Sequence, residues 1–173
     1  IMSKKFTTTE LRYRRSEAKS VQHSITYMKK YFIIIFFCFQ HLYSEDKSEI
    51  LFAMNKYNEA FILADYNQII ESFIFPVSII TSERMLSIDT KLGLRFVYKK
   101  IRGDLPEFYS YSKWNKIDIQ LIDKNVAIVK ASFSRYDKNG KKFYDGNGIY
   151  QLKKFNNKWK IFSMIPFQSF ENL

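Results

Sequence analysis

The sequence predicts an α+β fold in which helices come first and cover one face of an antiparallel sheet. Two observations carry this prediction. Between residues 47 and 63 the apolar side chains recur at spacings of three and four, the period of an amphipathic helix. From residue 117 onwards apolar and polar residues alternate, as in a strand with one buried face. This order of elements is typical of helices packed against a sheet.

The first predicted helix spans residues 47–63. Its apolar residues form one stripe: Ile50, Ala53, Met54, Tyr57, Ala60 and Phe61. Asp65 is suited to cap a second, short helix that extends to about Ser72. Pro76 is expected to stop that helix, because proline lacks the backbone N–H that a helix needs.

A small hairpin and a third helix follow. The runs Val77–Thr81 and Met85–Ile88 are rich in apolar and β-branched residues, so they predict two short paired strands. Asp89 or Thr90 can cap the next helix, which Gly103 ends in the usual C-terminal manner.

Four strands complete the predicted fold. They are Ile117–Leu121, Val126–Tyr136, Lys142–Lys154 and Trp159–Phe167. Asp137–Gly140 and Asn156–Asn157 supply tight turns between them. Gly146 and Gly148 predict a bulge or sharp bend in the third of these strands. Residues 45–173 contain no repeat or Pro/Gly-rich linker, so they are expected to form one domain.

Met28–Ser44 has the pattern of a secretory signal peptide. A methionine and two lysines precede the apolar run Tyr31–Phe39, and a short polar stretch ends at a small residue. A transmembrane helix needs roughly 20 apolar residues, and Gln40 and His41 interrupt this run. We therefore expect a periplasmic or secreted protein with no stable membrane anchor after cleavage.

The segment before the signal looks unlike a folded domain. We expect residues 1–27 to be a disordered, non-native upstream extension, with Met28 as the true initiator. The alternative is a real basic tail on a protein anchored by a buried or membrane helix. Under the first interpretation, the mature domain is 45–173.

Removal of the signal changes the chemistry available to the protein. The whole chain has a net charge of +11, of which residues 1–44 carry +6 and residues 45–173 carry +5. With this modest charge on the mature domain, we expect no nucleic-acid binding. Cys38, His23 and His41 all lie within residues 1–44 and are absent from the expected mature domain. Without cysteine or histidine, we expect no metal, no cofactor and no nucleophile–histidine pair.

Three segments resemble strands of the nuclear-transport-factor-2-like or SnoaL-like superfamily. They are Ala127–Gly140 (AIVKASFSRYDKNG), Gly148–Leu152 (GIYQL) and Lys158–Ile161 (KWKI). The resemblance covers roughly Ile50–Phe167. It implies a strongly curved sheet wrapped around three helices, with an apolar pocket at the wide end of a cone. Some members are isomerases, cyclases, dehydratases or epoxide hydrolases that have their active site in this pocket, and others only bind a ligand there. The fold alone therefore does not determine the function.

Arg135 is the most informative charged residue. It alternates in phase with four apolar residues of its strand: Ala127, Val129, Ala131 and Phe133. A buried arginine needs a carboxylate or an anionic ligand. Arg135 therefore either anchors a ligand carboxylate or enolate, or forms a salt bridge at the rim with Asp137 or Asp145. The predicted pocket residues are Tyr57, Phe61, Tyr66, Phe96, Trp114, Phe133, Arg135 and Tyr150.

Two functions follow from these residues. The preferred one is non-catalytic binding of a small apolar or weakly acidic molecule. The alternative is a cofactor-independent isomerase, cyclase or dehydratase with an Asp/Tyr/Arg pocket. Its candidate acids are Asp65, Glu71, Glu83 and Asp89. Asp65 and Asp89 are suited to cap helices, and none of the four acids matches a family motif. The binding function is therefore favoured.

The last strand also predicts an oligomer. Trp159 and Ile161 are expected in the core, yet the opposite face of the sheet is apolar as well. Apolar residues predicted there are Val126, Ile128, Phe162 and Met164. A sheet with two apolar faces is usually covered on both, so we expect a homodimer through the outer face.

Overall fold

The computed structural model describes residues 45–167. The predicted extension 1–27 and the predicted signal peptide 28–44 lie outside the described residues, together with the histidines and the cysteine. Within 45–167, no helix has the length and apolar character needed to cross a bilayer.

The helices form where their caps and apolar stripes predict. The N-terminal helix occupies 45–62 of the described chain. It buries the predicted stripe against the sheet: Ile50, Met54, Tyr57, Ala60 and Phe61. α2 (Tyr66–Glu71) begins after Asp65, whose carboxylate accepts two hydrogen bonds from backbone N–H groups of the first turn. α3 (Lys91–Gly103) begins after Thr90, whose hydroxyl caps its first turn.

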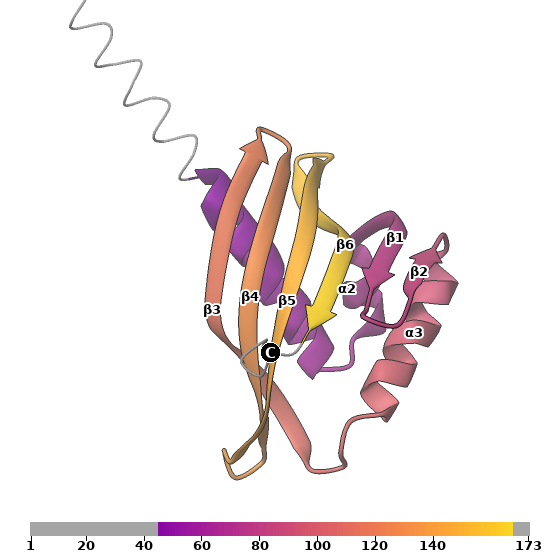
Figure 1. Ribbon diagram of the computed structural model, residues 1–173, viewed down its shortest axis with the longest axis vertical. Helices are drawn as coiled ribbons and strands as arrows, with labels where there is room; N and C mark the ends of the chain where they lie inside the picture. Colours follow the sequence, from indigo (N-terminus) through magenta and orange to yellow (C-terminus); the bar gives the residue numbers. More distant parts are fainter. Residues whose placement is uncertain (1–44, 168–173) are drawn as a thin grey trace, which may run out of the picture. The chain divides into compact units, whose positions relative to one another are not determined.

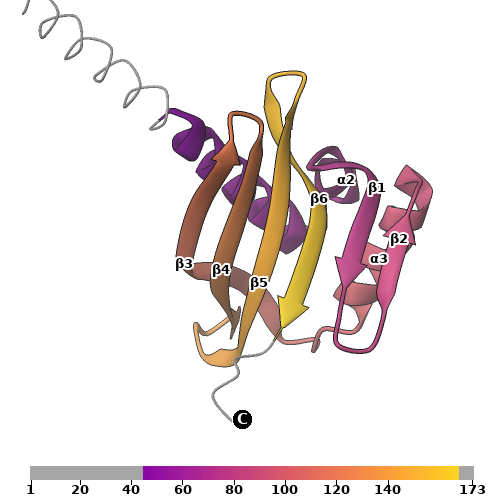
Figure 2. The ribbon, with the colours of Figure 1, turned by 45° about the horizontal axis from the view of Figure 1, so that its top comes forward.

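The six strands form one open, curved sheet in the order β2-β1-β6-β5-β4-β3 (Figure 1). Their bounds are β1 Phe73–Ile80, β2 Met85–Ile88, β3 Tyr109–Asp123, β4 Val126–Asp137, β5 Lys142–Phe155 and β6 Lys158–Phe167. All neighbours are antiparallel except β1 and β6, so the sheet is mixed. The N-terminal helix crosses one face of the long strands, and α3 lies beside β1 and β2 (Figure 2). The predicted α+β fold is confirmed.

Pro76 does not end the second helix. α2 already ends at Glu71, and Pro76 lies inside β1. The register between β1 and β6 shifts between Phe73 and Ser78, so the hydrogen-bond ladder is irregular around the proline. Proline, which lacks an N–H, is tolerated in a strand where the ladder is interrupted.

Gly146 and Gly148 make room for aromatic rings rather than forming a bulge. Both pair with β4 in continuous register. A Cβ atom on Gly146 would lie 2.6 Å from a ring carbon of Phe133, and one on Gly148 would lie 2.8 Å from a ring carbon of Tyr150. The predicted bulge at these glycines is therefore wrong, and steric contact with the neighbouring rings explains them instead.

A bulge does occur in β6. Leu152 pairs with Ile161, whereas the preceding residue of β5, Gln151, pairs with Ser163, so Phe162 is an extra residue. This extra residue reverses the alternation that follows it. Met164 is therefore buried on the helix-covered face, and its prediction as an outer-face residue is wrong.

Candidate functional site

A cavity of about 350 Å³ lies between the N-terminal helix, α3 and the covered face of the sheet. We call it the aromatic cavity, because aromatic rings supply much of its wall. Six of the eight predicted residues line it: Tyr57, Phe61, Trp114, Phe133, Arg135 and Tyr150. They come from the N-terminal helix and from β3, β4 and β5, segments that are distant in sequence.

The other two predicted residues lie elsewhere. Phe96 is 61% exposed, because α3 turns Leu94 and Tyr98 toward the core and Phe96 away from it. Tyr66 is the first residue of α2 and packs, partly buried, against the core outside this cavity. The prediction also missed Tyr98, which its position four residues after Leu94 on one helix face could have indicated.

Tyrosine hydroxyls meet at the deep wall of the cavity. Tyr57 Oη lies 2.9 Å from Tyr98 Oη, and the Tyr98 hydroxyl donates to Met164 Sδ at 3.6 Å. Burial raises the pKa of Tyr57 to about 12 and holds the pKa of Tyr98 and of Tyr150 well above the ordinary tyrosine range. These phenols are therefore neutral at physiological pH and cannot act as bases, and the protons of Tyr57 and Tyr98 are already used in the two hydrogen bonds above.

Arg135 lies against rings rather than acids. Its guanidinium carbon is 4.8 Å from the ring centroid of Tyr144, 5.3 Å from that of Phe133 and 5.8 Å from that of Phe61. Among residues 45–167 its Nε is buried without a hydrogen-bond partner, and no carboxylate lies within 4.0 Å of the guanidinium. The structure thus brings Arg135 to the cavity wall, as the strand phase predicts.

Neither acid predicted as a rim partner reaches Arg135. Asp145 forms an ion pair with Lys142 at 2.8 Å and accepts a hydrogen bond from Ser134. Lys142 lowers the pKa of the Asp145 carboxyl through that contact. Asp137 instead accepts backbone N–H groups of its own hairpin. Within the described part of the chain, the partly buried guanidinium of Arg135 therefore has aromatic rings and no carboxylate beside it.

Two further donors near these rings lack acceptors. Trp114 Nε1 and one terminal nitrogen of Arg102 are buried without hydrogen-bond partners among the described residues. The Arg102 guanidinium stands 4.7 Å from the ring centroid of Tyr109 and 5.5 Å from that of Phe61. A buried donor without a partner is costly, so this region favours an incoming acceptor or anion.

Carboxylates are nearly absent from the cavity. Of the residues in 45–167 that line it, Asp104 alone is acidic; it is well exposed and pairs with Lys100 at 3.0 Å. The predicted candidate acids lie elsewhere: Asp65 caps α2, Glu71 pairs with Lys91, and Glu83 and Asp89 are exposed. The described residues also hold no cluster of three metal-ligating side chains.

A family model described as "NTF2-like protein (DUF6841)" matches residues 46–169, most of the chain. The chain belongs to this NTF2-like family. The match covers the whole of the fold described above and so confirms the resemblance at the level of the superfamily. No curated protein matches the sequence of this NTF2-like protein at a significant level.

Solved structures share the fold of this NTF2-like protein at low sequence identity. A protein of unknown function with a cystatin-like fold from Nostoc punctiforme is 14% identical, with a TM-score of 0.60 over 74% of this chain and 96% of that one. A putative scytalone dehydratase from Novosphingobium aromaticivorans is 12% identical, with a TM-score of 0.61 over 75% and 88%. A ketosteroid isomerase-like protein from Erwinia carotovora is 17% identical, with a TM-score of 0.53 over 69% and 92%. At these identities the likeness extends to the fold alone.

Proposed function

We propose that this NTF2-like domain binds a small apolar molecule with a weakly acidic group in the aromatic cavity, without catalysing a reaction. One observation carries the proposal. Arg135 stands in an aromatic wall with an unpartnered Nε and with no carboxylate partner among residues 45–167. A ligand carboxylate would supply the missing partner.

The surroundings suit such a ligand. A guanidinium binds a carboxylate through two parallel hydrogen bonds, and these strengthen where water is excluded. The rings of Phe61, Phe133 and Tyr150 would cover the apolar part of the ligand. A volume of about 350 Å³ lies within the usual range for small-molecule sites.

An isomerase or dehydratase is the second candidate, favoured by the names of two structural neighbours. Such acid–base chemistry needs a group that can take up a proton near neutral pH. The raised pKa of Tyr57 leaves that hydroxyl protonated, and Asp104 is engaged by Lys100. Binding without chemistry therefore has more support.

The test compares cinnamate with cinnamamide, which have the same shape but differ in charge, by isothermal titration calorimetry. We expect cinnamate to bind roughly tenfold or more tightly than the amide, because a hydrogen bond to a charged group contributes about 1.5–3 kcal/mol. Arg135→Leu should remove that difference. Arg95→Leu, which removes an arginine that bonds Asn67 and does not line the cavity, is the matched control.

Two outcomes would contradict the proposal. Equal affinity for acid and amide, or a cinnamate affinity that Arg135→Leu leaves unchanged, would show that the arginine does not select the ligand. Chemical conversion of a bound acid would instead favour the enzymatic candidate.

A second copy of the domain is the proposed partner. Ile149 and Ile165 pair directly across β5 and β6, next to Tyr150 and Met164, which face the core. Alternation turns the two isoleucines outward, where Ile128 of β4 is also half-buried. We expect a dimer in sedimentation at micromolar concentration and a monomer for Ile149→Glu. A monomeric parent protein would count against this interface.

Export is the proposed localisation, resting on the signal-peptide pattern of residues 28–44. We expect the intact mass of the exported protein to correspond to a mature N-terminus near Glu45. A mass that includes Ile1 or Met2 would contradict cleavage.

A further inference from the structure

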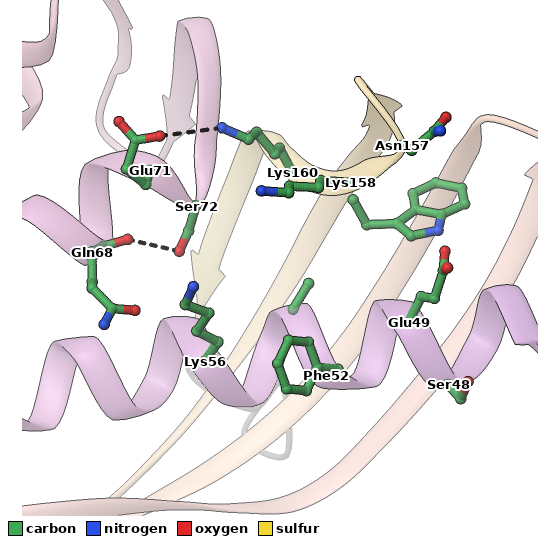
Figure 3. Close-up of a pocket in the computed structure, with 12 residues that line it drawn as sticks. Ser48, Glu49, Phe52, Lys56, Gln68, Glu71, Ser72, Asn157, Lys158 and Lys160 are labelled. Atoms are coloured by element: carbon green, nitrogen blue, oxygen red, sulfur yellow. Dashed lines mark hydrogen bonds and ion pairs between the residues drawn. The ribbon is translucent and has the colours of Figure 1, made fainter.

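A second hollow, of about 520 Å³, lies on the outside of the domain (Figure 3). We call it the lysine groove. One wall is a face of the N-terminal helix that carries Phe52 and Lys56. The other wall combines the end of α2, near Ser72, with the start of β6 at Lys158 and Lys160. None of these residues lines the aromatic cavity, so the groove is a separate site.

The acids of the groove are already neutralised by lysines. Glu49 Oε2 lies 2.8 Å from the Nζ of Lys154. Glu71 lies 3.0 Å from Lys91 through one carboxylate oxygen and 3.6 Å from Lys160 through the other. The Lys91 contact, above all, lowers the pKa of the Glu71 carboxyl. Each acid that lines the groove among the described residues therefore already has a lysine partner.

Two lysines of the groove remain unpaired. Lys56 comes from the helix and Lys158 from β6, and both side chains point into the space between the walls (Figure 3). Among residues 45–167, no carboxylate lies within 4.0 Å of either ammonium group. The groove therefore carries an uncompensated positive charge supplied from two facing walls.

An apolar surface lies beside these two lysines. Phe52 is 69% exposed, and Ala53 and the buried Trp159 continue the apolar surface. An exposed ring next to free cations is complementary to a ligand that joins an apolar group to anions.

We infer that the lysine groove binds an acidic peptide segment of a partner protein, with carboxylates at Lys56 and Lys158 and an apolar side chain against Phe52. Gln68 and Asn157 supply amide groups along the walls that can hydrogen-bond a peptide backbone. An extended segment can contact Lys56, Lys158 and the exposed ring of Phe52 together, whereas a small molecule would leave Phe52 largely in water.

The test measures fluorescence anisotropy of a labelled peptide, Gly-Glu-Glu-Phe-Glu-Gly, titrated with the full chain. We expect saturable binding that weakens at least roughly fivefold when glutamine replaces its glutamates or alanine replaces its phenylalanine. Lys56→Ala/Lys158→Ala should weaken binding by a similar factor. These lysines are exposed, so their replacement should not disturb folding, which circular dichroism checks.

The matched control is Lys99→Ala/Lys153→Ala, which removes two exposed lysines outside the groove and leaves the same net charge. We expect it to bind the peptide like the parent protein. Absence of saturable binding, or equal weakening in both double variants, would overturn the inference. Arg135→Leu should bind the peptide normally, so failure of the cavity proposal and failure of this one are distinguishable.

Discussion

The aromatic cavity and the lysine groove both combine aromatic rings with basic side chains, but the rings and charges singled out in each differ in exposure. In the cavity, Tyr98 is 1% exposed and Arg135 lies against rings. In the groove, Phe52 is 69% exposed and Lys56 extends into open space. Tyr98 is therefore part of the core, whereas Phe52 and Lys56 can change without loss of folding. Four predictions test this contrast.

The largest expected difference is in stability. Tyr98→Ala should lower the free energy of unfolding by about 3–5 kcal/mol, because it removes a buried ring and leaves a void. Phe52→Ala should change it by less than about 0.5 kcal/mol, since that ring is mostly in water already. Urea denaturation measures both. A comparable loss in the two variants would mean that the groove belongs to the core.

The next largest difference is expected at alkaline pH, because among residues 45–167 tyrosines line the cavity and not the groove. The folded state holds the pKa of Tyr57 at about 12, above its ordinary value near 10. The native state therefore binds more protons above pH 10, and stability must fall from about pH 10 to pH 12, by about 3 kcal/mol for this group. Tyr57→Phe should remove that part of the slope in pH-dependent urea denaturation; an unchanged slope would contradict the assignment.

A smaller effect is expected from Gly148→Ala. The added Cβ would lie 2.8 Å from the ring of Tyr150, which lines the cavity, so that ring must move. We expect a loss of about 1–3 kcal/mol in stability and a changed affinity for cinnamate, with peptide binding in the groove unaffected. Gly103→Ala, which has nothing within 4 Å of its added Cβ, is the control and should not destabilise.

The smallest effect is that of salt on the two affinities. Raising sodium chloride from about 50 to about 300 mM should weaken peptide binding by roughly threefold, because the groove lysines are in contact with solvent. Cinnamate binding beside Arg135 should change by less than about twofold, since a partly buried pair is less screened. Parallel titrations at both salt concentrations measure this, and equal salt dependence would mean that the cavity is as open to water as the groove.

The sequence predicts much of the fold because its local signals agree with one another. The caps Asp65 and Thr90 and the two turns Asp137–Gly140 and Asn156–Asn157 all occur as expected, with positive φ at Gly140 and at both asparagines. Strand phase also placed Arg135 on the covered face. These are properties of a few neighbouring residues, so one sequence suffices to recognise them.

The errors share a different cause. Pro76, Gly146 and Met164 were assigned from local rules, but their settings depend on a neighbouring strand or on a ring distant in sequence. The lysine groove was missed for the same reason. Nothing local indicates that Lys56 and Lys158 face each other, because only the packing of the N-terminal helix beside β6 brings them together.

The bulge at Phe162 has a consequence for comparing relatives of this chain. Phe162 and Ser163 together face Gln151, so deletion of one residue here would restore regular pairing and still leave Met164 facing the cavity. A relative that lacks this residue needs a one-residue gap at Phe162. Aligned without that gap, it would have every later residue of β6 assigned to the wrong face of the sheet, and the cavity wall would be compared with the outer surface.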